Sequence, residues 1–236
     1  MDNPVEIVEN PLTDLELANL QLGVFAKQPI PGQVKTRLTP PLSSFEAAEL
    51  YSVSLRETLM RCTSAGLAPV LFYSGEREYF ASEFSGIELA PQVAGDLGSR
   101  LDAAMRHLLG QAACQGAVLI GSDSPDLPLT LLGEAFVTLK DADCLVAPAA
   151  DGGYVLIGMR RYCGELFAQI PWSSPGVLEA TRRKAQEGGL NYREIACWED
   201  VDDLHSLHRL LKRSPWSQTA RYAAKRLAEH FSGQQT

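Results

Sequence analysis

Residues 117–127 read AVLIGSDSPDL, an apolar run that gives way to a polar loop with two acidic residues. A fully apolar run of this length is typical of a strand at the centre of a parallel sheet, where both faces are buried. We therefore expect residues 117–121 to form such a strand and the acidic loop to follow its carboxyl end. Similar runs predict strands at residues 20–26, 68–73, 87–90, 144–147 and 154–158, and an edge strand at 192–198.

Segments with a helical spacing of apolar residues separate these strands. Ser43 and Glu46 form the S-x-x-E pattern of a capping box, so a helix should begin there and continue to about residue 65. The alternation of strands and helices predicts a three-layer α/β/α sandwich with a mostly parallel, Rossmann-like sheet. We expect one domain over residues 20–236, preceded by an arm of residues 1–19. Further helices are expected at about 98–114, 128–140, 174–187, 202–213 and 215–231.

The composition is that of an ordinary globular protein, with 45% hydrophobic and 21% charged residues. A net charge of -8 gives no general attraction for nucleic acid, although local basic clusters can still bind a small phosphate compound. No apolar run approaches the roughly 18 residues of a membrane span, and the acidic N-terminus does not resemble a signal peptide. The five cysteines are widely spaced and form no CxxC pair, which predicts free thiols and a cytoplasmic location.

The first candidate site is the loop after the strand at residues 20–26. Lys27, Lys35 and Arg37 lie within eleven residues of one another, and Gly32 between them would let the backbone approach a ligand. Lysine and arginine side chains form charge-assisted hydrogen bonds to phosphate oxygens, so this loop is a candidate phosphate site. The alternative is a solvated surface loop. The loop contains neither a GxGxxG nor a GxxxxGK[ST] motif, so neither dinucleotide-type nor P-loop chemistry is indicated.

The acidic loop after residue 121 is the second candidate. Asp123 directly follows the apolar strand, at the end of a parallel sheet where ligands bind. Mg²⁺ favours one or two carboxylates together with substrate phosphates, so Asp123 is a candidate metal ligand. We expect Asp126 to cap the following helix or to order the loop.

Two further polar clusters follow later strands. The turn of Asp151, Gly152 and Gly153 could let a substrate lie against the backbone, beside Tyr154, or could simply be a tight turn. In the cluster of residues 200–203, an aspartate before a helix is usually an N-cap, and a second metal carboxylate is the alternative. His107, His205, His208 and His230 do not have the spacing of a zinc site.

Five stretches in this order resemble a bacterial family of GT-A-fold proteins, which have the nucleotide-diphospho-sugar transferase fold. They are VFAKQPIPGQVKTRL (24–38), GDLGSRL (95–101), LIGSDSPDLP (119–128), APAADGGYVLIGM (147–159) and WEDVDDLHSL (198–207). Members of this family are labelled glycosyltransferases or rSAM/selenodomain-associated transferases. The likeness covers about residues 20–211. It adds Gly98, in the second stretch, to the candidate nucleotide-binding residues.

The sequence also resembles, more distantly, molybdenum-cofactor and phospholactate guanylyltransferases. This resemblance implies that Asp123 binds the metal and that Lys35 and Arg37 hold phosphates. A D-x-D motif, matched here by Asp200 to Asp202, would supply a second carboxylate, and we assign it to Asp202. Two features depart from the pattern. The D-x-D is followed by DLHSL rather than T-P-x-D-L, and a K-x-P-x-P-G-x-V-K-T-R loop replaces the Gly-rich start.

These observations predict a transferase that uses a nucleotide-diphospho-sugar and Mg²⁺ or Mn²⁺. Asp123 and Asp202 would hold the metal, while Lys35 and Arg37 would stabilise the departing nucleotide diphosphate. The unknown acceptor would enter near residues 151–154. Nucleotidyl transfer from an NTP, with release of pyrophosphate, is the alternative, and a non-catalytic nucleotide-binding protein is the third. The base, the sugar, the acceptor and the oligomeric state do not follow from the sequence.

Overall fold

The first apolar run forms β1 (Leu20–Lys27), in the interior of a sheet with the strand order β3-β2-β1-β4-β6-β5-β7. The computed structural model describes residues 19–227 and 229, and this part of the chain contains the seven strands of the sheet. All pairings are parallel except those of β6, which runs antiparallel to β4 and β5. The mostly parallel sheet is therefore confirmed. The other strands are β2 (Pro69–Ser74), β3 (Glu88–Pro91), β4 (Gly116–Gly121), β5 (Cys144–Pro148), β6 (Tyr154–Met159) and β7 (Tyr192–Glu194).

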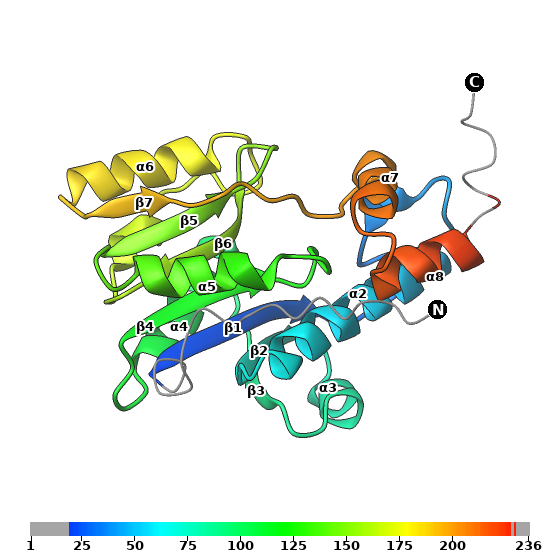
Figure 1. Ribbon diagram of the computed structural model, residues 1–236, viewed down its shortest axis with the longest axis horizontal. Helices are drawn as coiled ribbons and strands as arrows, with labels where there is room; N and C mark the ends of the chain where they lie inside the picture. The colour runs from blue at the N-terminus through cyan, green and yellow to red at the C-terminus, as the bar shows by residue number, and fades with distance from the viewer. Residues whose placement is uncertain (1–18, 228, 230–236) are drawn as a thin grey trace.

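Helices cover both faces of the sheet, as the alternating pattern predicted. Residues of α2, α3 and α5 pack on one face, and residues of α4, α6 and the short helix η2 pack on the other. Figure 1 shows α2 and α5 in front of the strands. The helices are η1 (Thr36–Leu38), α2 (Ser44–Ser64), α3 (Arg77–Glu83), α4 (Leu97–Leu109), α5 (Leu129–Thr138), η2 (Gly164–Phe167), α6 (Val177–Glu187), α7 (Leu204–Arg213) and α8 (Gln218–Arg226).

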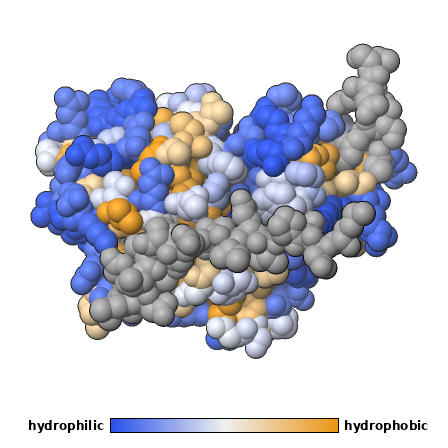
Figure 2. Space-filling model, viewed as in Figure 1, coloured by the Kyte–Doolittle hydropathy of each residue, from blue (hydrophilic) through white to orange (hydrophobic). Residues whose placement is uncertain are grey.

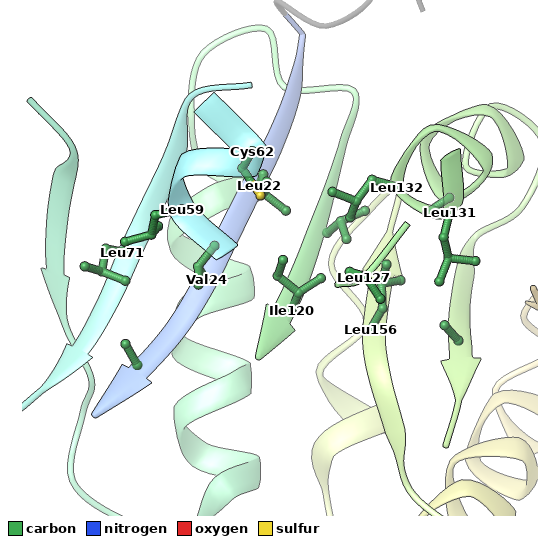
Figure 3. Packing of buried hydrophobic residues seen from close by; sticks show 14 of the residues in the cluster. Leu22, Val24, Leu59, Cys62, Leu71, Ile120, Leu127, Leu131, Leu132 and Leu156 are labelled. Atoms are coloured by element: carbon green, nitrogen blue, oxygen red, sulfur yellow. The ribbon is translucent and has the colours of Figure 1, made fainter. Parts of the chain in front are cut away.

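Alternate side chains of β1 fill the two halves of the core. Leu22 and Val24 point towards α2, where they meet Leu59 and Cys62 (Figure 3). Phe25, the residue after Val24, belongs to the opposite face and stacks on the ring of Phe72 in β2. A strand buried on both faces needs apolar residues at every position, which explains the unbroken apolar runs in the sequence.

The capping box before α2 is present. The Ser43 side chain accepts a hydrogen bond from the Glu46 backbone N–H, and the Glu46 carboxylate accepts one from the Ser43 N–H. Several boundaries differ from prediction, and one helix was not predicted. Helix α4 ends at Leu109 rather than near residue 114, and Gly110 is its C-cap. The edge strand is only Tyr192–Glu194, and the short helix α3 was not predicted.

Helices α7 and α8 form a separate apolar cluster beside the loop that follows β1. Leu38 and Leu42 of that loop pack with Leu207 and Leu210 of α7. Figure 1 shows α7 next to this loop, away from α6, and Figure 2 shows hydrophilic surface over both helices with an apolar area between them. The packing brings the segment before α7 close to the end of β1. The predicted arm lies outside the described residues except for Asn19.

Within residues 19–227 and 229, the helices are all too short or too polar to cross a membrane.

Candidate functional site

A cleft of about 620 Å³ opens at the end of the sheet where the parallel strands finish. It lies where β1 and β4 end and where β6 begins, because the antiparallel β6 starts at the edge where the parallel strands finish. Lys27, Lys35, Arg37, Asp123 and Tyr154 all line it. The cleft therefore brings together the basic loop after β1, the acidic loop after β4 and the beginning of β6. These three segments are far apart in the sequence.

Lys35 occupies the centre of this arrangement. Its side chain is only 5% exposed, and its ammonium forms ion pairs with the carboxylates of Asp123 and Asp202, the second at 3.0 Å. Burial alone would lower the pKa of Lys35, but the two carboxylates outweigh burial and raise it above its ordinary value. Lys35 is therefore a buried, charged group held between two acids. Sequence reasoning placed all three residues in the site but did not foresee this ion pairing.

The two acidic loops are joined directly by the backbone. The N–H of Val201 donates to the carbonyl oxygen of Asp123 at 2.8 Å. This bond places Asp202 beside the loop that carries Asp123. Both carboxylates keep substantial contact with solvent, since their side chains are 43% and 41% exposed.

The cluster of residues 200–203 divides between different tasks. Asp203 is the N-cap of α7 and accepts a hydrogen bond from the Ser206 N–H, as expected of an aspartate before a helix. Asp202 faces Lys35 instead. Asp200 lines the cleft and is half-buried, and this burial, together with the nearby charge of Asp202, raises its pKa to about 6.

Asp126 orders the acidic loop but does not cap α5, whose N-cap is Pro128. Its buried carboxylate accepts two hydrogen bonds from the Arg213 guanidinium, at 2.7 and 2.9 Å, and one from the Ser214 hydroxyl. Arg213 also donates to Glu199. This network fastens the acidic loop to the end of α7. Sequence reasoning missed Arg213, which looks like an ordinary basic residue in the last turn of a helix.

Sequence reasoning also missed Tyr51 of α2, which lines the cleft. Its hydroxyl accepts a hydrogen bond from the Lys27 N–H and is 2.8 Å from the hydroxyl of Ser122. Burial raises the pKa of Tyr51 to about 12, so it stays neutral. A tyrosine in an apolar helical stripe gives no sign in the sequence that its hydroxyl joins two strand ends.

The remaining basic candidates are more exposed than Lys35. Arg37 is 75% exposed, and its guanidinium is 4.0 Å from the Asp202 carboxylate. Lys27 lies at the exposed end of β1. Both side chains line the cleft and can reach a ligand there.

The candidate glycines are explained mainly by the backbone and by packing. Gly32 and Gly152 have positive φ values of 80° and 88°, which favour glycine. A Cβ on Gly98 would lie 2.3 Å from the indole nitrogen of Trp172, so this glycine allows α4 to pack closely. Gly32, Gly98 and residues 151–153 are not among the residues lining the cleft, whereas Tyr154 is. The Asp151 carboxylate accepts a hydrogen bond from the Gly153 N–H and stabilises the turn.

The donor set suits a hard cation that also binds substrate. Within the described part of the chain, no group of three or more His, Cys, Asp or Glu side chains could hold a metal ion without further ligands. Asp123 and Asp202 supply two partly exposed carboxylates, and both already bind the ammonium of Lys35. Two carboxylates completed by phosphate oxygens are an arrangement that Mg²⁺ favours. The residues therefore fit a metal that arrives with a phosphorylated ligand.

Comparison with known proteins gives a family and a fold. Residues 58–174 match the family described as "Uncharacterized protein conserved in bacteria (DUF2064)". The crystal structure of a "putative nucleotide-diphospho-sugar transferase" from Desulfovibrio desulfuricans G20 is 31% identical, with a TM-score of 0.82. The match covers 89% of this chain and 96% of that one. No curated protein matches the chain.

Two more distant structures show the same fold. Rv0371c from Mycobacterium tuberculosis H37Rv, in complex with manganese, is 18% identical with a TM-score of 0.52, covering 83% of this chain and 99% of that one. CMP:2-keto-3-deoxy-manno-octonic acid synthetase, complexed with CTP, is 11% identical with a TM-score of 0.53, covering 84% and 99%. The nucleotide-diphospho-sugar transferase fold predicted from the sequence is confirmed.

Proposed function

Because this chain belongs to the DUF2064 family and matches the Desulfovibrio protein over nearly its whole length, we propose that it is a metal-dependent transferase acting on a nucleotide-diphospho-sugar. The observation that carries the proposal is the convergence of Lys35, Asp123 and Asp202 in one cleft. These residues come from three loops, and their charges suit a divalent cation and a diphosphate. A cytoplasmic location agrees with the free thiols of the described cysteines.

Each residue then has a separate task. Asp123 and Asp202 hold Mg²⁺ or Mn²⁺, which supplies Lewis-acid stabilisation of the charge on the diphosphate. Arg37 and Lys27 bind phosphate oxygens from the open side of the cleft, where their exposed side chains can turn towards the ligand. Tyr154, at the beginning of β6, borders the acceptor side, and the turn of residues 151–153 positions it.

Nucleotidyl transfer is the second candidate. A structure complexed with CTP shares the fold over 84% of this chain, although at 11% identity this likeness concerns the fold alone. The same carboxylates and cations would serve both reactions. The products distinguish them. Pyrophosphate released from an NTP indicates nucleotidyl transfer, whereas a free nucleotide diphosphate released from an NDP-sugar indicates glycosyl transfer.

The first test is binding rather than turnover, because the acceptor is unknown. We expect Mn²⁺ together with nucleotide diphosphates to raise the melting temperature of the wild-type protein, since a ligand that binds only the folded state stabilises it. Asp123→Asn should remove the metal-dependent part of this rise with little change in the fold. Unchanged metal dependence in this variant would refute the assignment of Asp123.

Arg37 provides an independent test of phosphate binding. Arg37→Ala should weaken the binding of a nucleotide diphosphate by about 1.5–3 kcal/mol, the range for hydrogen bonds to charged groups, and should hardly affect a nucleoside. The exposed side chain makes a loss of folding stability small. Titration of both ligands by calorimetry measures the difference. Equal losses for the two ligands would mean that Arg37 shapes the cleft without contacting phosphate.

A further inference from the structure

The Lys35 ammonium lies where a cation shared by Asp123 and Asp202 would have to lie. It is bonded to one carboxylate oxygen of each residue, and its stem is covered, leaving the side chain 5% exposed. Lys35 is the N-cap of η1 and has a left-handed backbone conformation, with φ 48° and ψ 38°. The backbone thus turns the side chain inward, whereas Arg37, two residues later, extends into solvent.

The two acids are far more exposed than the lysine that they bind. Their side chains are more than 40% exposed, so their remaining oxygens stay open to the cleft. The Asp202 backbone N–H is fixed by the Ser206 hydroxyl, and Asp123 is tied to Val201 through its carbonyl. The backbone that carries each carboxylate is therefore held in place, while the four-carbon lysine side chain has the rotatable bonds needed to move its ammonium away from them.

A positive charge already placed between two carboxylates opposes a second cation at the same position. Like charges at short range repel strongly where water is excluded, as it is around the covered Lys35 stem. A diphosphate changes this balance, because its oxygens offer the ammonium another partner and offer a metal additional ligands. When the Lys35 ammonium moves from the carboxylates to the diphosphate, a metal can bind the carboxylates more readily. A bound metal in turn favours this position of the ammonium.

We propose that Lys35 is an internal counter-ion that keeps divalent metal away from Asp123 and Asp202 until a diphosphate enters the cleft. The diphosphate takes over the ammonium, and the carboxylates become available to the metal. Metal and diphosphate therefore bind with positive coupling, and Lys35 carries that coupling. The proposal rests on the proposed function, since it takes the two carboxylates to be metal ligands.

The decisive experiment is a titration of the protein with Mn²⁺ alone. Electron paramagnetic resonance of the free ion measures the affinity for Mn²⁺. Lys35→Met keeps the length of the stem and removes the charge. It should bind Mn²⁺ more tightly than the wild type by about 5- to 150-fold, the usual range for coupling between two ligands. Lys35→Arg keeps a cation and should remain close to the wild type.

Lys27→Met is the matched control, because it removes one positive charge from the same cleft but at an exposed position. Solvent and salt screen that charge, so Mn²⁺ affinity should change by about threefold or less. Adding Asp123→Asn to Lys35→Met should abolish the gained affinity. If Lys35→Met binds Mn²⁺ no more tightly than Lys27→Met, Lys35 is a permanent structural ion pair and the proposal is wrong.

Lys35→Met leaves two carboxylates without their cation, so the variant could be less stable than the wild type. A measurement of melting temperature tests the proposal in that case. Mn²⁺ should then raise the melting temperature of Lys35→Met by more than it raises that of the wild type, because metal replaces the lost charge. An equal or smaller rise contradicts the proposal. The failure of the proposed function looks different, since it leaves the wild type without Mn²⁺ binding even when pyrophosphate is present.

Discussion

The ion pair between Asp126 and Arg213 should be the strongest single polar contribution to the stability of the site region. The Asp126 side chain is fully buried, and Arg213 supplies two of its three hydrogen bonds. Arg213→Met would leave a buried carboxylate with only the Ser214 hydroxyl. Breaking a buried pair by removing one partner costs about 3–5 kcal/mol. Because the Arg213 side chain is 24% exposed, we expect a loss near the lower limit, about 3 kcal/mol.

Urea denaturation followed by circular dichroism measures this loss as a shift in the midpoint at constant slope. Arg209→Met is the control, because Arg209 pairs with Glu199 but is 43% exposed, so its loss should be below about 1 kcal/mol. Combining Arg213→Met with Asp126→Leu should restore much of the stability, since no charge then remains buried. A loss in Arg213→Met no larger than that in Arg209→Met would refute the reasoning.

Three further predictions concern burial elsewhere. Glu57→Ala should lower the free energy of unfolding by about 2–3 kcal/mol, because this buried carboxylate accepts hydrogen bonds from two backbone N–H groups and two hydroxyls at the start of α8. The exposed Glu49→Ala should change it by less than about 0.5 kcal/mol in the same urea assay, and equal losses would contradict this assignment. Gly98→Ala should lower the melting temperature by the equivalent of about 1–3 kcal/mol, because a tryptophan side chain already fills the space of its Cβ, and an unchanged value would exclude close packing as the reason for glycine. The exposed Cys197 should react with a thiol reagent long before Cys62, whose thiol pKa burial raises to about 12, and mass mapping that finds Cys62 modified first would show otherwise.

The elements of the fold were predictable wherever a local signal was strong. The capping box at Ser43 fixed the start of α2, and the apolar run at 117–121 became β4 with one extra residue. Short elements without such signals were not predictable. Helix α3 has only seven residues, and β7 is limited to the three residues that pair with β5.

The membership of the site was partly predictable, but its internal bonding was not. The rule that ligands bind at strand ends pointed to Asp123 because it follows a buried strand. No local pattern could indicate that Lys35 pairs with Asp202, because the two residues are 167 positions apart and meet only after α7 packs on the loop beyond β1. A lysine in a loop with prolines and glycine suggests exposure. The left-handed backbone at residue 35, which turns the side chain inward, appears only in the folded structure.

The dependence of the site on α7 has a consequence for the synthesis of the protein. Ribosomes deliver Lys35 and Asp123 well before Asp202, so a nascent chain can assemble β1 and β4 while the Lys35 ammonium still has only one of its two acids. A message that ends prematurely before residue 202 would yield the same incomplete site. Such a product would contain all seven strands of the sheet, the last of which ends at Glu194, but would lack the Asp202 carboxylate and the Arg213 partner of Asp126. The acidic loop of such a product would have lost its Arg213 partner, so we expect proteases to cleave this loop more readily than in the full-length chain.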